Sequence, residues 1–66
     1  MLKVGDLVHT IIERSPPWRP EKGTLAVVVG GEVHSFAIRY TRVLIINGCF
    51  QGQHMEFVSN QLEKVR

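Results

Sequence analysis

Short runs of β-branched and aromatic residues, repeatedly broken by glycine or proline, constrain this chain more than any other feature of its sequence. Valine, isoleucine and threonine suit the pleated backbone of a strand, whereas glycine and proline interrupt regular structure. No segment repeats apolar residues at i, i+3, i+4 and i+7 over the roughly dozen residues that a helix needs. The pattern therefore predicts an all-β fold of five to six short antiparallel strands.

The expected strands follow the apolar runs along the chain. They cover residues 3–12, 24–29, 33–40, 43–46, 49–58 with a break at 51–53, and 62–65. Gly30-Gly31 and Asn47-Gly48 predict turns, because such pairs adopt positive φ readily. Alternation within 33–40 places His34, Phe36, Ile38 and Tyr40 on one face. Ser59-Asn60-Gln61 predicts one short 3-10 turn before the last strand, with Asn60 as its cap.

A chain of 66 residues forms one domain, here expected to span 1–66, and buries only about 60% of its unfolded surface. A small β-sheet that closes on itself is filled by its own side chains, so it leaves no deep pocket. The sequence contains no His-Glu-x-x-His, no Gly-x-Ser-x-Gly and no phosphate-binding glycine loop. His9, His34 and His54 lie on separate expected strands. We therefore expect no enzymatic activity, no cofactor, no metal site and no small-molecule substrate.

Charge and cysteine content indicate the cellular compartment and its redox state. Eight Lys and Arg against six Asp and Glu give a net charge of +2, and the basic residues are scattered. A single cysteine, Cys49, excludes an internal disulfide. No apolar run approaches the roughly 20 residues that cross a bilayer, and the N-terminal residues do not resemble a signal peptide. These features predict a reduced, cytoplasmic protein without a membrane partner.

Three segments resemble SH3-like small β-barrels, and together with their spacing they extend the resemblance over nearly the whole chain. They are 4–8 (Val-Gly-Asp-Leu-Val), 23–28 (Gly-Thr-Leu-Ala-Val-Val) and 57–65 (Phe-Val-Ser-Asn-Gln-Leu-Glu-Lys-Val). The chain is most similar to the short, stand-alone barrels that bacteriophages encode. This resemblance implies a virion assembly factor, a capsid or tail accessory, or an adaptor to a host protein. Such a protein would lie in the host cytoplasm or in the virion.

The chain carries more large apolar side chains than a minimal barrel can enclose. Phe36, Ile38 and Tyr40 add to a core that the other strands already fill, and overpacking is costly. Some of these side chains should therefore stay on the surface, where apolar patches usually mark association. We expect the segment 30–42, with an edge strand at 43–46, to pack against a second copy or a larger protein partner.

The loop from Pro16 to Pro20 allows two interpretations. Three prolines stiffen it, so it can be a rigid connector whose Trp18 covers the core. Alternatively, Pro17-Trp18-Arg19-Pro20 fits Pro-x-x-Pro, and Trp and Arg are prominent among interface residues. In that case Trp18 and Arg19 contact the protein partner.

A basic and aromatic face is the alternative to protein binding. Its candidate residues are Arg14, Trp18, Arg19, Arg39, Tyr40 and Arg42. Aromatic rings can stack bases while arginine follows phosphates. The sequence thus favours a non-enzymatic protein-binding or assembly module, with a nucleic-acid-binding small barrel as the alternative.

Overall fold

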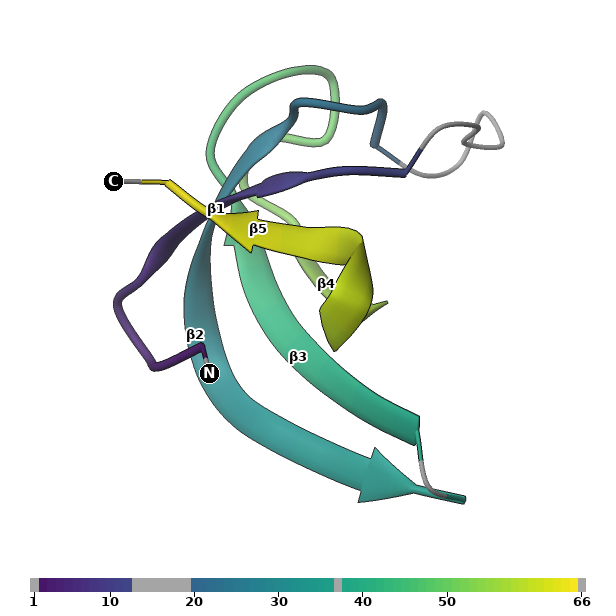
Figure 1. The fold of residues 1–66 in the computed structure, drawn as a ribbon. Helices are drawn as coiled ribbons and strands as arrows, with labels where there is room; N and C mark the ends of the chain where they lie inside the picture. The colour runs from purple at the N-terminus through teal and green to yellow at the C-terminus, as the bar shows by residue number, and fades with distance from the viewer. Residues whose placement is uncertain (1, 13–19, 37, 66) are drawn as a thin grey trace.

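The computed structural model describes residues 2–12, 20–36 and 38–65. It shows five strands and one 3-10 turn, which Figure 1 labels along the chain. They are β1 (Leu7–Thr10), β2 (Leu25–Ser35), β3 (Ile38–Ile45), β4 (His54–Val58), the turn η1 (Ser59–Gln61) and β5 (Leu62–Lys64). The all-β class, the number of strands and the 3-10 turn before the last strand are confirmed.

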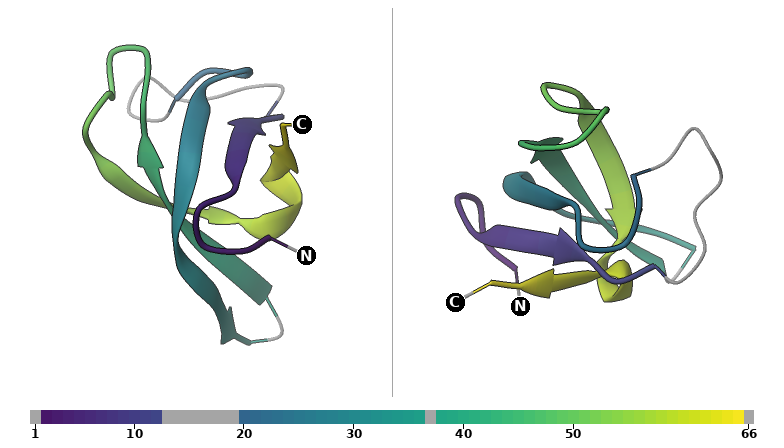
Figure 2. Two further views of the ribbon diagram at one scale, coloured as in Figure 1. Left: turned by 90° about the vertical axis from the view of Figure 1, so that its left-hand side faces the viewer. Right: turned by 90° about the horizontal axis from the view of Figure 1, so that it is seen from above.

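All five strands join one antiparallel sheet in the order β4-β3-β2-β1-β5. The last strand returns to the first, with His9 opposite Glu63, so β4 and β5 are the outer strands of this open sheet. The sheet curves strongly, as Figures 1 and 2 show, and η1 carries the chain from one outer strand to the other. A single curved sheet can thereby enclose a small core.

The core lies on the concave face. Its seven buried apolar side chains come from every strand: Val8, Ala26, Val28, Val43, Ile45, Phe57 and Leu62. Alternate residues point to opposite faces of a strand, which is why buried and accessible positions alternate along β1 and β3. Val4 is 66% exposed, because it lies in the turn before β1.

Two buried threonines contribute polar contacts to this apolar interior. The Thr10 hydroxyl donates to the Glu21 carbonyl (2.6 Å) and accepts from the Thr24 amide (3.2 Å). The hydroxyls of Thr41 and Ser59 are hydrogen-bonded at 2.8 Å. Buried polar groups need such partners, and these contacts fix the chain before β2 and the start of η1 to the sheet.

Strand β2 is bent by two register shifts. Val28 lies opposite Val43, Gly30 opposite Arg42, and a second shift follows before the residues that face Tyr40. Each shift inserts an extra residue into β2, which bends the strand and increases its twist. The prediction that Gly30-Gly31 forms a turn is therefore wrong, because both glycines lie inside the strand.

The turn between β2 and β3 instead occurs at Phe36. The prediction of one continuous strand over 33–40 is wrong, because the alternation in the sequence runs across a chain reversal. Strand β3 consequently lies between β2 and β4 in the sheet. Residues 43–46 therefore do not form an edge, contrary to expectation.

The connection after β3 is longer than a two-residue hairpin. Gly48 and Gly52 adopt positive φ, Cys49 and Phe50 lie in turns, and β4 begins only at His54. The expected strand start at Cys49-Phe50 is thus wrong. The 3-10 turn also has no side-chain cap, so the capping role expected for Asn60 is wrong.

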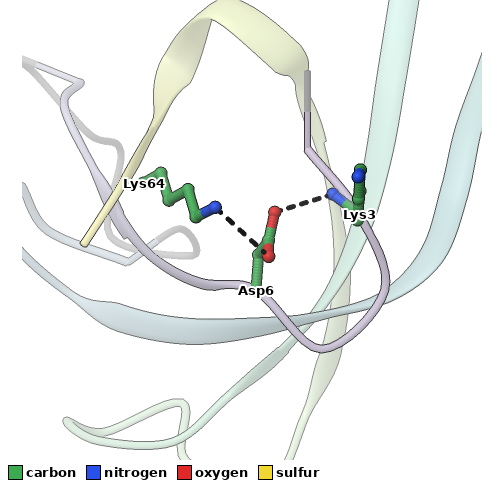
Figure 3. A network of polar contacts seen from close by, with 3 residues as sticks. All are labelled: Lys3, Asp6 and Lys64. Atoms are coloured by element: carbon green, nitrogen blue, oxygen red, sulfur yellow. Dashed lines mark hydrogen bonds and ion pairs between the residues drawn. The ribbon is translucent and has the colours of Figure 1, made fainter. Parts of the chain in front are cut away.

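A polar cluster fastens the N-terminal segment to the last strand (Figure 3). The Lys3 amide donates to Asp6 Oδ2 at 2.8 Å, and Lys64 Nζ lies 3.7 Å from Asp6 Oδ1. The Asp6 amide in turn donates to the Lys3 carbonyl at 3.0 Å. Asp6 thereby joins the turn before β1 to β5.

Candidate interaction surface on the distal hairpin

The far halves of β2 and β3, residues 29–36 and 38–42, form a projecting hairpin, which we call the distal hairpin. Pairing of β2 with the N-terminal segment ends at Val28, whose amide and carbonyl bond Asp6 and Gly5. Pairing of β3 with β4 begins at Tyr40. Beyond these points, the described strands β2 and β3 pair only with each other. Figures 1 and 2 show the ribbon extending away from the rest of the sheet.

Phe36 lies at the tip of the distal hairpin. Its side chain is 98% exposed, and its backbone has φ 49°. A bulky residue in the left-handed region carries strain of about 1–3 kcal/mol. Full exposure also forgoes the roughly 1.5–3 kcal/mol that burial of a large apolar side chain provides. The identity of this residue therefore does not serve the stability of the fold.

The neighbours of Phe36 on β3 include apolar and basic side chains. Ile38 is 42% exposed, Tyr40 is half-buried, and Arg39 and Arg42 are exposed. Because successive residues of a strand alternate, Ile38, Tyr40 and Arg42 share the outer face and Arg39 lies on the other. The structure thus brings together the expected apolar residues of the protein-binding site.

The residues of the nucleic-acid alternative are divided between the faces of the hairpin. Tyr40 and Arg42 lie on the outer face, where β4 places Glu56 opposite Arg42. Arg39 lies on the opposite face. In the described part of the hairpin, Arg39, Tyr40 and Arg42 therefore do not share one basic face, and an acidic residue lies opposite Arg42.

The other predicted site residues, Arg14, Trp18 and Arg19, lie outside the described residues, and so does most of the Pro16–Pro20 loop. Its last proline, Pro20, is buried. Both interpretations of that loop stay predictions.

A hollow of about 160 Å³ occupies the end of the molecule opposite the hairpin. It is lined by Pro20, Glu21, Thr24, Asn47, Gly48, Cys49 and Phe50. These residues come from the chain before β2 and from the β3–β4 connection, which lie together at the top of Figure 1. The hydrogen bond from the Leu25 amide to Asn47 Oδ1 (2.9 Å) joins the two segments. Sequence reasoning missed this hollow because it assigned Cys49 and Phe50 to a strand.

Titratable side chains form no evident reaction centre within the described residues. The described residues contain no group of three or more His, Cys, Asp or Glu side chains arranged to hold a metal ion. His9 Nε2 lies 3.7 Å from Glu63 Oε1 across β1 and β5, and Cys49 is exposed. None of the helical segments in the described part is long and apolar enough to cross a membrane.

Comparisons with protein-family models, curated proteins and solved structures found no match to this chain. The resemblance to SH3-like barrels and to phage-encoded proteins therefore stays a prediction.

Proposed function

We propose that this protein is a non-enzymatic protein-binding or assembly module that contacts its partner through Phe36 at the tip of the distal hairpin. The observation that carries the proposal is the combination of 98% exposure and positive φ at this phenylalanine. Residues with a strained backbone conformation cluster at functional sites, so such a residue is a reason to propose a function there. Large aromatic side chains are also enriched in protein interfaces.

The surroundings of Phe36 support the same function. Ile38 and Tyr40 extend the apolar surface along β3, and exposed Arg39 and Arg42 border it. An apolar centre with a polar rim is the usual composition of a protein interface. The partner is a second copy or a larger protein. The resemblance to phage-encoded barrels supports a role as a virion accessory or as an adaptor in the host cytoplasm.

Nucleic-acid binding is the second candidate, supported by the two exposed arginines that flank Tyr40 in sequence. Titration with single-stranded and duplex DNA at rising salt tests it. Binding through phosphates must weaken steeply as salt increases. Absence of binding at low salt would exclude this candidate.

Site-specific photocrosslinking tests the protein-binding proposal. Benzoylphenylalanine is placed at position 36, where it preserves an aromatic ring, and in a matched control at Asn60, which is exposed on η1. We expect one discrete protein adduct from position 36 and none from position 60. When the partner is a larger protein, excess unlabelled wild-type protein should suppress the adduct, whereas excess Phe36→Asn should not. Equal crosslinking from both positions would contradict the proposal.

A further inference from the structure

The tip of the distal hairpin lies at the opposite end of the molecule from the chain before β2 and the β3–β4 connection, as Figure 1 and the left view of Figure 2 show. These two segments line the hollow. We propose that Phe36 of one copy inserts into the hollow of the next copy, so that the chains assemble head to tail. This inference rests on the proposed function and names its partner as a second copy of this chain.

The dimensions of the hollow suit a phenyl ring. Its volume is about 160 Å³, and an engineered apolar cavity of about 150 Å³ binds benzene. Phe50, which is half-buried, supplies apolar surface on its wall. Phe36 is almost fully exposed at the end of a projecting ribbon, so its ring can enter a hollow on another molecule without rearrangement of the core.

Charge is complementary between the two ends. Glu21 lines the hollow and is exposed. Arg39 is exposed three residues after Phe36. Among the described ion pairs neither Glu21 nor Arg39 takes part. Insertion of Phe36 would bring Arg39 to the rim of the hollow, where an opposite charge favours the correct orientation of the partner.

The symmetry of this contact determines which oligomers can form. The tip and the hollow are different surfaces, so the contact is heterologous and each bound copy still offers one free tip and one free hollow. Growth continues until a ring closes or a filament forms. A mass that rises with concentration beyond that of a dimer is therefore expected for the wild-type chain.

Complementation between two variants tests the arrangement. Phe36→Asn removes the ring from the tip and leaves the hollow intact. Cys49→Trp fills the hollow from an exposed wall position and leaves the tip intact. Sedimentation velocity from micromolar to millimolar concentration should find each variant monomeric. Their equimolar mixture should contain a heterodimer of twice the chain mass and nothing larger, because the only remaining pair is one tip with one hollow.

A charge exchange provides a second test that does not depend on Cys49→Trp folding. Glu21→Arg and Arg39→Glu should each weaken assembly of the wild-type chain at least several-fold, and the double variant should restore it. Far-ultraviolet circular dichroism establishes that each variant keeps the wild-type sheet.

The outcomes separate this inference from the proposed function. A monomeric wild-type chain at every concentration, a mixture that stays monomeric, or full assembly of either single variant would overturn head-to-tail assembly. In each of these cases, a discrete crosslink from position 36 to a different protein would still support the proposed function. Absence of any crosslink from position 36 would contradict both.

Discussion

Gly30 and Arg42 approach each other so closely that a Cβ at position 30 would lie 3.2 Å from the Cβ of Arg42. The two residues are paired across β2 and β3, between the two register shifts that bend β2. A side chain at position 30 would therefore require the Cβ of Arg42 to shift by a few tenths of an ångström, and glycine avoids this crowding.

Gly30→Ala should lower the free energy of unfolding by about 1 kcal/mol, the usual size of a moderate packing defect. The added methyl group must move a Cβ that is attached directly to the backbone of β3, so relaxation is restricted. Urea denaturation followed by circular dichroism measures the change. In an Arg42→Gly background the same substitution should cost markedly less. An equal cost in both backgrounds would show that the contact with Arg42 is not the cause.

Phe36→Asn should leave stability unchanged or raise it by up to about 1 kcal/mol, because asparagine tolerates positive φ better than a bulky residue. Almost no buried contact is lost, since the side chain is exposed. The same variant should abolish association through the tip. Chemical denaturation and sedimentation velocity on one sample check both results.

The buried Phe57 serves as the control for this prediction. Phe57→Leu should destabilise the fold by about 1 kcal/mol or more, because it removes part of a fully buried ring. It should leave tip-mediated association intact in the folded fraction. A destabilised Phe36→Asn, or one that still associates, would contradict the role given to Phe36.

Asp6→Ala should destabilise the protein by about 1 kcal/mol, a typical value for a lost hydrogen bond. It removes the acceptor of the Lys3 amide and the partner of Lys64 together. Lys64→Met should cost less than about 0.5 kcal/mol, because the lysine of this ion pair is exposed to solvent and ion pairs at the surface contribute little. Thermal denaturation of both variants measures the stability that each one loses. A larger loss for Lys64→Met would assign the stabilisation to the ion pair rather than to the turn.

Thr10→Val should lower the free energy of unfolding by about 1 kcal/mol, because it removes both hydrogen bonds of the buried Thr10 hydroxyl, to the Glu21 carbonyl and from the Thr24 amide. Thr24→Val is the matched control, since its hydroxyl donates to the same Glu21 carbonyl (2.7 Å) from an exposed position. We expect the control to lose less than half as much. Equal losses in denaturant titrations would be evidence against a special role for the buried hydroxyl of Thr10.

The sequence was informative where local chemistry alone decides the structure. Ser59-Asn60-Gln61 and the following strand were predicted because a short polar turn between two apolar runs has few alternatives. Gly30 was misassigned because glycine suits a turn and a bulge equally, and only the proximity of Arg42 distinguishes them. No sequence pattern indicated the chain reversal at Phe36, since a phenylalanine with positive φ is uncommon.

The candidate surface was predicted in part. The excess of apolar residues at 36–40 correctly indicated that some would remain exposed. The hollow depends on two segments more than 20 residues apart, joined by the bond from Leu25 to Asn47. Such a long-range contact leaves no periodic pattern in the sequence.

Fluorine NMR of protein labelled with 4-fluorophenylalanine tests the central claim most directly. The three phenylalanines, Phe36, Phe50 and Phe57, report separately on the tip, the wall of the hollow and the core. On association we predict that the Phe36 signal moves and loses its sensitivity to exchange of H₂O for D₂O, that Phe50 moves with it when the partner is a second copy, and that Phe57 stays fixed. A Phe36 signal that keeps its free position and its solvent sensitivity, at every concentration and with any partner captured by crosslinking, would contradict the account.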